Sequence, residues 1–235
     1  MSPQNFAERL AAVRERMTRA AGRSGRSAHS VTLLAIGKAQ PPEMLAMAAD
    51  LGIADFGESY LQEALEKIAA LRERRITWHF VGRLQANKTR QVAEEFAWVH
   101  ALDRLKIAER LAAQRPFHAP ALNVCLQVNL GGEASKGGVT PTQLPALAAA
   151  VARLPRLQLR GLMCLPPEES EPARQRAWFA QLRALRDELN GGGAGLDTLS
   201  MGMSGDFEAA IEEGATVVRV GTALFGLRPT TIRTS

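Results

Sequence analysis

One lysine, Lys38, directly follows the first apolar, β-branched stretch of the chain, VTLLAIG from Val31 to Gly37. A strand of this composition is typical of a parallel sheet buried on both faces, where an ammonium is costly and the neutral amine is favoured. A neutral lysine amine is a nucleophile toward aldehydes. The alternative is a lysine whose stem extends from the strand end to water. Position alone supports both interpretations equally.

A glycine- and serine-rich segment near the C-terminus, LSMGMSGDFEAAIEEG, has the composition of an anion site. Gly202 lets the backbone approach a ligand closely, and Ser200 and Ser204 offer hydroxyls. Ser204 is also placed to N-cap a helix over residues 205–213, so free N–H groups and the positive end of a helix dipole converge there. By itself, such a segment is explained equally well by a turn and a helix cap.

A second short loop strengthens the anion interpretation. Gly221 and Thr222 follow the last apolar stretch, in VRVGTALFG. In (β/α)₈ barrels, phosphate sites are usually built from the loops after the seventh and eighth strands. The two loops together therefore predict a phosphate site.

Arg219 lies inside that last apolar stretch, between Val218 and Val220. A guanidinium there must be paired or hydrogen-bonded to be tolerated. It could serve a carboxylate such as Asp206 or Glu208, or donate to the ring nitrogen of a ligand. A lysine for an aldehyde, a cradle for a phosphate and an arginine for a heterocyclic nitrogen match the functional groups of pyridoxal 5'-phosphate (PLP).

Strands and helices alternate along the whole chain, and this pattern predicts how these residues are positioned. Eight strand-like stretches are expected, starting at Val31, Ile53, Ile76, Ala97, Leu122, Leu157, Leu196 and Thr216. Eight such units in 235 residues favour an α/β fold with a single (β/α)₈ TIM barrel, one domain over residues 1–235. An open doubly wound sheet is the alternative, but AIGKAQPPEM after the first strand lacks its glycine fingerprint.

Helix signals complete this pattern. Phe6, Leu10, Val13 and Met17 recur at helical spacing and predict an extra N-terminal amphipathic helix. Thr140 and Gln143 form a capping-box pair for the helix after the fifth strand, with Pro141 between them. Asn190-Gly191 and Gly214 are expected to end helices as left-handed caps.

Composition and charge exclude several classes of protein. The formal charge of +5 comes largely from the first 28 residues, with six Arg against two Glu, and aromatic residues are only 5% of the chain. A solvated helix face explains this better than nucleic-acid binding. Apolar runs are too short to cross a membrane, and the histidines show no metal-ligand spacing. Cys125 and Cys164 fit buried thiols in a reducing compartment, so a cytoplasmic location is expected.

At these residues the chain strongly resembles the pyridoxal phosphate homeostasis proteins, the YggS-like or PROSC-type family, related in fold to the barrel domain of alanine racemase. The resemblance rests on the lysine of LLAIGK and on FGESYLQEA, WHFVGRLQANK, QVNLGGEASKGG, GLM and LSMGMSGDFEAAIEEGATVVRVGTALFG, in this order. The usual SKTKP motif of the family is GKAQP here, and the usual Asn of FGEN is Ser59. These departures affect polar contacts around the ring, while the lysine is retained.

The resemblance implies a role for each site residue. It implies a PLP Schiff base on Lys38, an arginine, Arg219, facing the pyridine nitrogen, and Met203 beside the ring. The phosphate would be bound by Ser204, Gly221 and Thr222, with help from Ser200 and Gly202. No catalytic residue and no metal ligand is implied.

A carrier of vitamin B6 is expected rather than an enzyme with fast turnover. Alanine racemases add a C-terminal β-domain and a tyrosine base from a dimer partner, whereas this chain is expected to end soon after the eighth strand, and its only tyrosine is Tyr60. Two-sided proton transfer then lacks its second acid/base. A weak racemase-like PLP enzyme is the alternative, and a barrel aldolase would leave Arg219 without a task. The resemblance implies a monomer that serves PLP-dependent apoenzymes.

Overall fold

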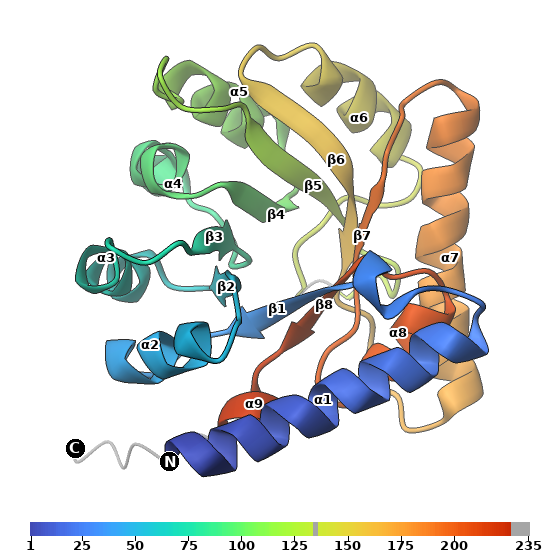
Figure 1. Ribbon diagram of the computed structural model, residues 1–235. Coiled ribbons are helices and arrows are strands. Elements are labelled where there is room, and N and C mark those ends of the chain that lie inside the picture. Colours follow the sequence, from blue (N-terminus) through green and yellow to red (C-terminus); the bar gives the residue numbers. More distant parts are fainter. Residues whose placement is uncertain (134–135, 227–235) are drawn as a thin grey trace, which may run out of the picture.

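Eight parallel strands form a closed barrel in the computed structural model, which describes residues 1–133 and 136–226. The strands pair in chain order, and β8 closes on β1 with Leu34 opposite Arg219 (Figure 1). This confirms the predicted barrel and each of the eight predicted strands. Their bounds are β1 (Thr32–Ile36), β2 (Asp55–Glu58), β3 (Thr77–Phe80), β4 (Trp98–Leu102), β5 (Leu122–Val128), β6 (Leu157–Cys164), β7 (Thr198–Ser200) and β8 (Val217–Val220).

Helices connect the strands and cover the outside of the barrel (Figure 1). They are α1 (Pro3–Arg23), α2 (Pro42–Asp50), α3 (Leu61–Ala70), α4 (Thr89–Glu95), α5 (Leu105–Gln114), α6 (Leu144–Ala152), α7 (Pro172–Gly191), α8 (Phe207–Glu212) and α9 (Thr222–Phe225), with 3₁₀ turns at Ala28–Ser30 and Ala86–Lys88. In residues 1–133 and 136–226 no helix is long and apolar enough to span a bilayer.

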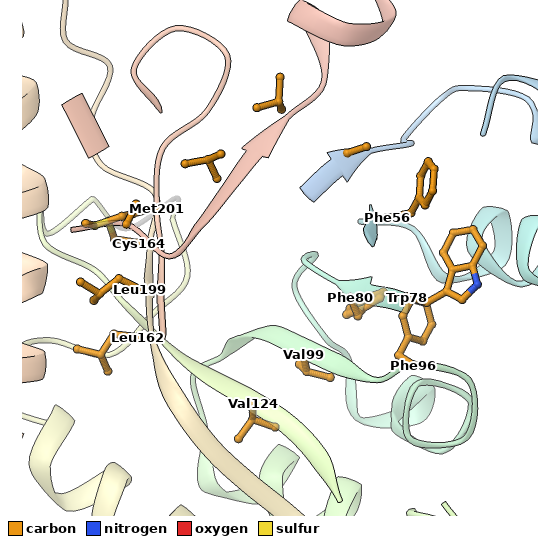
Figure 2. Packing of buried hydrophobic residues seen from close by; sticks show 14 of the residues in the cluster. Phe56, Trp78, Phe80, Phe96, Val99, Val124, Leu162, Cys164, Leu199 and Met201 are labelled. Atoms are coloured by element: carbon orange, nitrogen blue, oxygen red, sulfur yellow. The ribbon is translucent and has the colours of Figure 1, made fainter. Parts of the chain in front are cut away.

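The main hydrophobic core lies between the barrel wall and the helices. Successive side chains of a strand point to opposite faces, so every second residue packs outward. Figure 2 shows Phe56, Trp78, Phe80 and Phe96 grouped in this layer. The rings of Phe56 and Trp78 are 5.9 Å apart, and those of Phe80 and Phe96 are 5.4 Å apart.

The inside of the barrel is unusually polar. The alternate residues, which point inward, include His79, His100, Gln127, Ser200 and Arg219, all buried. The smaller apolar cluster inside comprises Ala101, Cys125 and Met163, with Trp98 and Leu165 against it. Interiors of such barrels are usually filled by branched apolar side chains. A polar interior must therefore be satisfied by its own hydrogen bonds.

The predicted N-terminal helix is α1, and it packs beside α8 and α9 (Figure 1). Phe6 is fully buried against Phe225, with ring centroids 5.4 Å apart. Arg16 donates two hydrogen bonds to Glu208 at 3.1 and 2.7 Å and lies over the Phe207 ring. The helix therefore supports the two short helices that follow β7 and β8.

Two helix-end predictions differ in detail from the structure. Thr140 and Gln143 make both capping-box bonds, at 3.1 and 3.3 Å, but they close a turn, and α6 begins only at Leu144. Gly214 has φ of +98° and ends α8 as predicted. Gly191 is the last residue of α7, and the left-handed glycine there is Gly193.

Candidate functional site

A cavity of about 360 Å³ opens at the carboxyl ends of the strands. This volume is at the lower end of the range for small-molecule sites. Six of the residues singled out from the sequence line it: Lys38, Met203, Ser204, Arg219, Gly221 and Thr222. The structure thus brings the Lys38 stretch together with two stretches near the C-terminus, where Met203 is 165 and Thr222 is 184 positions farther along the chain. Because barrel strands end at one face, distant loops meet there.

Lys38 sits in a turn just after β1, and both of its neighbours in the chain are anchored. The carbonyl of Gly37 accepts a hydrogen bond from Lys67 Nζ at 2.7 Å. The N–H of Ala39 donates to Glu63 Oε1 at 2.6 Å. Ala39 has φ of +62°, a conformation that residues other than glycine rarely adopt. The turn is therefore held in an uncommon shape, with Lys38 at the cavity.

The anchor itself is a buried ion cluster on β2 and α3. Lys67 is 2% exposed and donates to Glu58 Oε1 at 2.8 Å and to Glu63 Oε1 at 2.5 Å. Glu58 is fully buried, and its Oε2 atom has no partner within the described ranges. Burial raises the pKa of Glu58 to about 7, and the hydrogen bond from Lys67 opposes that shift. The charge of Lys38 also lowers this pKa, which places Lys38 in the same electrostatic cluster.

Arg219 is buried in the barrel wall with part of its guanidinium at the cavity. Nη1 donates to the carbonyl of Ser200 at 2.7 Å and to its Oγ at 2.9 Å, and Nη2 donates to the carbonyl of Cys164 at 2.8 Å. These bonds use three of the five N–H groups of arginine. The other two have no acceptor among residues 1–133 and 136–226. They remain available to a ligand.

Neither carboxylate considered for Arg219 from the sequence is hydrogen-bonded to it. Glu208 pairs with Arg16 instead. Asp206 accepts from the backbone N–H of Met203 at 2.5 Å. Burial lowers the pKa of Arg219, and the charge of Asp206 opposes this. An arginine remains protonated even so, and the cavity therefore contains a fixed cation.

The anion end of the cavity is formed by two turns placed against each other. Ser204 does not cap α8 as predicted, because α8 begins at Phe207 with Asp206 before it. The Ser204 hydroxyl accepts instead from the N–H of Ala223 at 3.2 Å, which joins the loop after β7 to the loop after β8. In the described part of the chain, the N–H groups of Ser204, Gly205 and Thr222 make no hydrogen bond. Three donors and two hydroxyls thus converge at this end.

Two of the residues singled out from the sequence do not line the cavity. Ser200 is fully buried and lies between Arg219 and His100. Gly202 has φ of +88°, its carbonyl accepts from the N–H of Arg219, and a Cβ there would lie 2.5 Å from the Cβ of Ala210. Gly202 therefore permits close packing of α8 and holds the backbone of Arg219.

The support around the Lys38 turn could not be predicted from the sequence. Glu63 and Lys67 stand four residues apart on one helix face, which is a detectable ion-pair signal, but their contact with the Lys38 turn is not visible in sequence. His79 lies in the barrel interior, and Asn129 and Lys136 line a separate hollow.

Comparisons with known proteins agree with this geometry. Residues 9–229 match the family model described as alanine racemase, N-terminal domain. A pyridoxal phosphate homeostasis protein from Pseudomonas aeruginosa is 57% identical over 95% of this chain and 96% of its own length. The Escherichia coli protein of the same name is 49% identical over 95% and 97% of the two chains.

A solved structure extends the similarity to three dimensions. PipY of Synechococcus elongatus, whose structure was solved with PLP bound, superposes with a TM-score of 0.83 at 38% identity, over 94% of this chain and all of PipY. The cavity at the strand ends, the lysine after β1 and the paired loops after β7 and β8 thus occur in a chain that belongs to the pyridoxal phosphate homeostasis protein family.

Proposed function

We propose that this chain binds PLP in the cavity at the strand ends and serves as a carrier in vitamin B6 homeostasis. The observation that carries the proposal is that Lys38, Arg219 and the Ser204 and Thr222 loops line one cavity. Each of the three functional ends of PLP then meets a chemically matched group. The names of the two bacterial relatives and the PLP-bound PipY structure support the same function.

The residues present fit the cofactor end by end. The amine of Lys38 adds to the aldehyde carbon, one water leaves, and a Schiff base links protein and cofactor. The free N–H groups of Ser204, Gly205 and Thr222 suit a phosphate. Because Ser204 Oγ accepts from Ala223, its own O–H remains free to donate. Met203, half exposed at the cavity, is placed to contact the ring face.

Arg219 limits the carbanion chemistry of the cofactor, but the alanine racemases are similar in this respect, so the carrier function does not rest on it. A protonated guanidinium donates to the ring nitrogen and keeps that nitrogen unprotonated. When bound, PLP stabilises carbanions by drawing electrons into its ring, and an unprotonated ring does so weakly. Arg219 therefore reduces the reactivity of the cofactor while holding it.

A weak racemase-like activity is the alternative, and one contact favours it. The ring of Tyr60, the only tyrosine, has its centroid 6.0 Å from Lys38 Nζ. However, Tyr60 is 60% exposed, so its side chain is in contact with water and not enclosed in a site. Exchange of the α-proton of D- and L-alanine in deuterated water, measured with wild type and Tyr60→Phe, decides between the two functions. The carrier proposal expects no exchange above that of free PLP and no difference between the two proteins.

We further propose that PLP-dependent apoenzymes are the partners, that the protein acts as a monomer, and that it works in the cytoplasm. The location is supported by two free thiols, Cys125 and Cys164, which are buried with pKa values raised to about 12. Such thiols are inert and fit a reducing compartment.

The absorption spectrum of the protein with added PLP tests the attachment at Lys38. Wild type is expected to show a visible Schiff-base band that borohydride abolishes while fixing the cofactor to the protein. Lys38→Ala should show neither. Lys106→Ala, which removes an exposed lysine of α5, is the matched control and should behave as wild type. A band that persists in Lys38→Ala would refute the attachment.

A further inference from the structure

A continuous chain of hydrogen bonds runs through the polar interior of the barrel, and neither the sequence motifs nor the proposed function accounts for it. It links one residue from each of five strands. His79 Nε2 lies 3.0 Å from Asp55 Oδ1, His79 Nδ1 lies 2.9 Å from His100 Nε2, and His100 Nδ1 lies 2.8 Å from Ser200 Oγ. Ser200 Oγ in turn accepts from Arg219.

The hydrogen-bond chain connects the two ends of the barrel. Asp55 is the first residue of β2 and is partly exposed at the amino end of the strands. His79 and His100 are the third residues of β3 and β4. Arg219 reaches the cavity at the carboxyl ends. Figure 1 shows β2, β3 and β4 side by side along the barrel wall, with β7 and β8 following farther around it.

The chemistry of the linked groups fixes which atom donates each hydrogen bond. A carboxylate only accepts, so His79 must donate from Nε2 to Asp55. A neutral His79 then accepts at Nδ1, which requires a proton on His100 Nε2. A neutral His100 accepts at Nδ1, so Ser200 must donate its O–H there. Arg219 only donates, and a lone pair of Ser200 Oγ accepts the hydrogen bond from its N–H. The carboxylate of Asp55 thus fixes the arrangement, and the donation from Arg219 to Ser200 Oγ is compatible with it.

Burial keeps both rings in the neutral form that this arrangement needs. His79 is 2% exposed and His100 is fully buried. Burial lowers the pKa of His79, and burial, with the neighbouring His79 ring and the charge of Arg219, lowers the pKa of His100 well below its ordinary value. Trp98 stacks on His79 at 5.6 Å and 8°, which fixes the plane of the ring.

Arg219 needs this support because its acceptors among the described residues are all neutral: two carbonyls and one hydroxyl. A hydroxyl can turn, and a Ser200 O–H rotated toward the guanidinium would repel it. The lone pair of His100 Nδ1 prevents that rotation. Each bond in the chain also polarises the next, toward the carboxylate of Asp55.

We propose that His100, with His79 behind it, is a positioning residue for the cofactor: it locks Ser200 as an acceptor and so fixes Arg219 with its two unused N–H groups toward the ring nitrogen. The link to the cofactor rests on the proposed function, whereas the direction of the hydrogen bonds is a property of the protein alone.

An NMR experiment on the apo protein tests the hydrogen-bond chain directly. Nitrogen-15 NMR of histidine-labelled protein at neutral pH should show His79 and His100 neutral, each with the proton on Nε2, identified by the loss of their signals in His79→Phe and His100→Phe. A proton on His100 Nδ1, or a charged ring in either residue, overturns the proposal. This result does not depend on whether PLP binds.

PLP affinity and the absorption band of the bound form test the positioning role. His100→Phe and Ser200→Ala should each weaken PLP binding about tenfold, the equivalent of one hydrogen bond to a charged group, and should shift the band. His100→Asn keeps an acceptor near the position of Nδ1 and should restore affinity to within about threefold of wild type. His118→Phe, at an exposed histidine, is the matched control.

The outcomes separate this proposal from the proposed function. Wild-type affinity and an unshifted band in a folded Ser200→Ala, or no rescue by His100→Asn, refute the positioning role even where wild type binds PLP through Lys38. If wild type itself fails to bind PLP, the proposed function and the link to the cofactor are both wrong. The NMR result still tests the hydrogen-bond chain. Ser200→Ala removes one oxygen only, so it keeps the test valid where His100→Phe does not fold.

Discussion

Single charges decide how the Lys38 turn is held. Lys67 places one ammonium between two carboxylates and a backbone carbonyl, almost without access to water. Removing one partner of a buried ion pair leaves the other charge uncompensated. The resulting loss of stability is larger than the net stability that the pair contributes. Because Gly37 and Ala39 flank Lys38, this cluster holds the turn that contains Lys38.

Lys67→Met is predicted to lower the free energy of unfolding by about 3 kcal/mol, since Glu58 and Glu63 lose their common donor. Urea denaturation of the apo protein measures this. The double variant Glu58→Gln/Lys67→Met should recover part of the loss, because it also removes a buried carboxylate. A loss in Lys67→Met no larger than that of the exposed-site control Lys106→Met contradicts the account.

The raised pKa of Glu58 predicts a specific pH dependence of stability. The folded protein retains the Glu58 proton up to about pH 7, whereas the carboxyl ordinarily loses it near pH 4.5. This stabilisation is therefore complete below about pH 4.5 and is lost as pH rises through about 7. Relative to Glu58→Gln, wild type should lose about 2 to 3 kcal/mol of unfolding free energy across that window. A difference between the two proteins that stays constant with pH would contradict it.

At this scale the sequence predicted the groups that touch the cavity better than those behind them. Lys38 and Arg219 stand out because a charge in an apolar strand is costly and needs a reason. His100 does not stand out, and Ser200 was expected to help bind the phosphate, because the role of a buried histidine or serine depends on a partner that the sequence does not show. Their contact joins residues 100 positions apart, and no local pattern contains it.

Among the elements, α1 supports the site without lining its cavity. Its apolar face packs on the helices that follow the loops after β7 and β8, and Phe6 contacts Phe225 of α9. Arg16 and Arg23 add ion pairs to Glu208 and Glu212. These pairs are partly exposed, so solvent screens them, and packing contributes most of the stabilisation.

Phe6→Ala should therefore destabilise the protein by about 3 to 4 kcal/mol, and Arg16→Ala by no more than about 1 kcal/mol. Thermal and urea unfolding of both variants measure the contrast. Phe6→Ala should also weaken PLP binding at temperatures where the variant is still folded, because α9 loses its support. Equal losses in the two variants would show that α1 is held by its charges instead.

Element ends were harder to predict than elements. Ser204 has the residue type and the spacing of an N-cap, yet Asp206 occupies the position before α8. The Ser204 hydroxyl is used across the site, by Ala223 of α9. A tertiary hydrogen bond has replaced the local one that the sequence favours, and this occurs at the place where ligand binding is proposed.

The whole molecule combines two layers with different tasks. Apolar residues facing outward join the barrel to its helices and provide most of the buried surface (Figure 2). The polar residues facing inward connect Asp55 at one end of the barrel to Arg219 at the other. Eight strand and helix units predict closure, since few other folds accommodate them. Which inward residues bond to one another depends on strand register, which only the closed barrel defines.

We propose that Lys38 and the loops after β7 and β8 hold one PLP molecule, and a crystal structure of the protein grown with PLP tests this most directly. We expect continuous density from Lys38 Nζ to the aldehyde carbon, the phosphate within hydrogen-bonding distance of Ser204 and Thr222, and Arg219 at the ring nitrogen. PLP attached to another lysine, or lying in this cavity with its phosphate away from both loops, would contradict it.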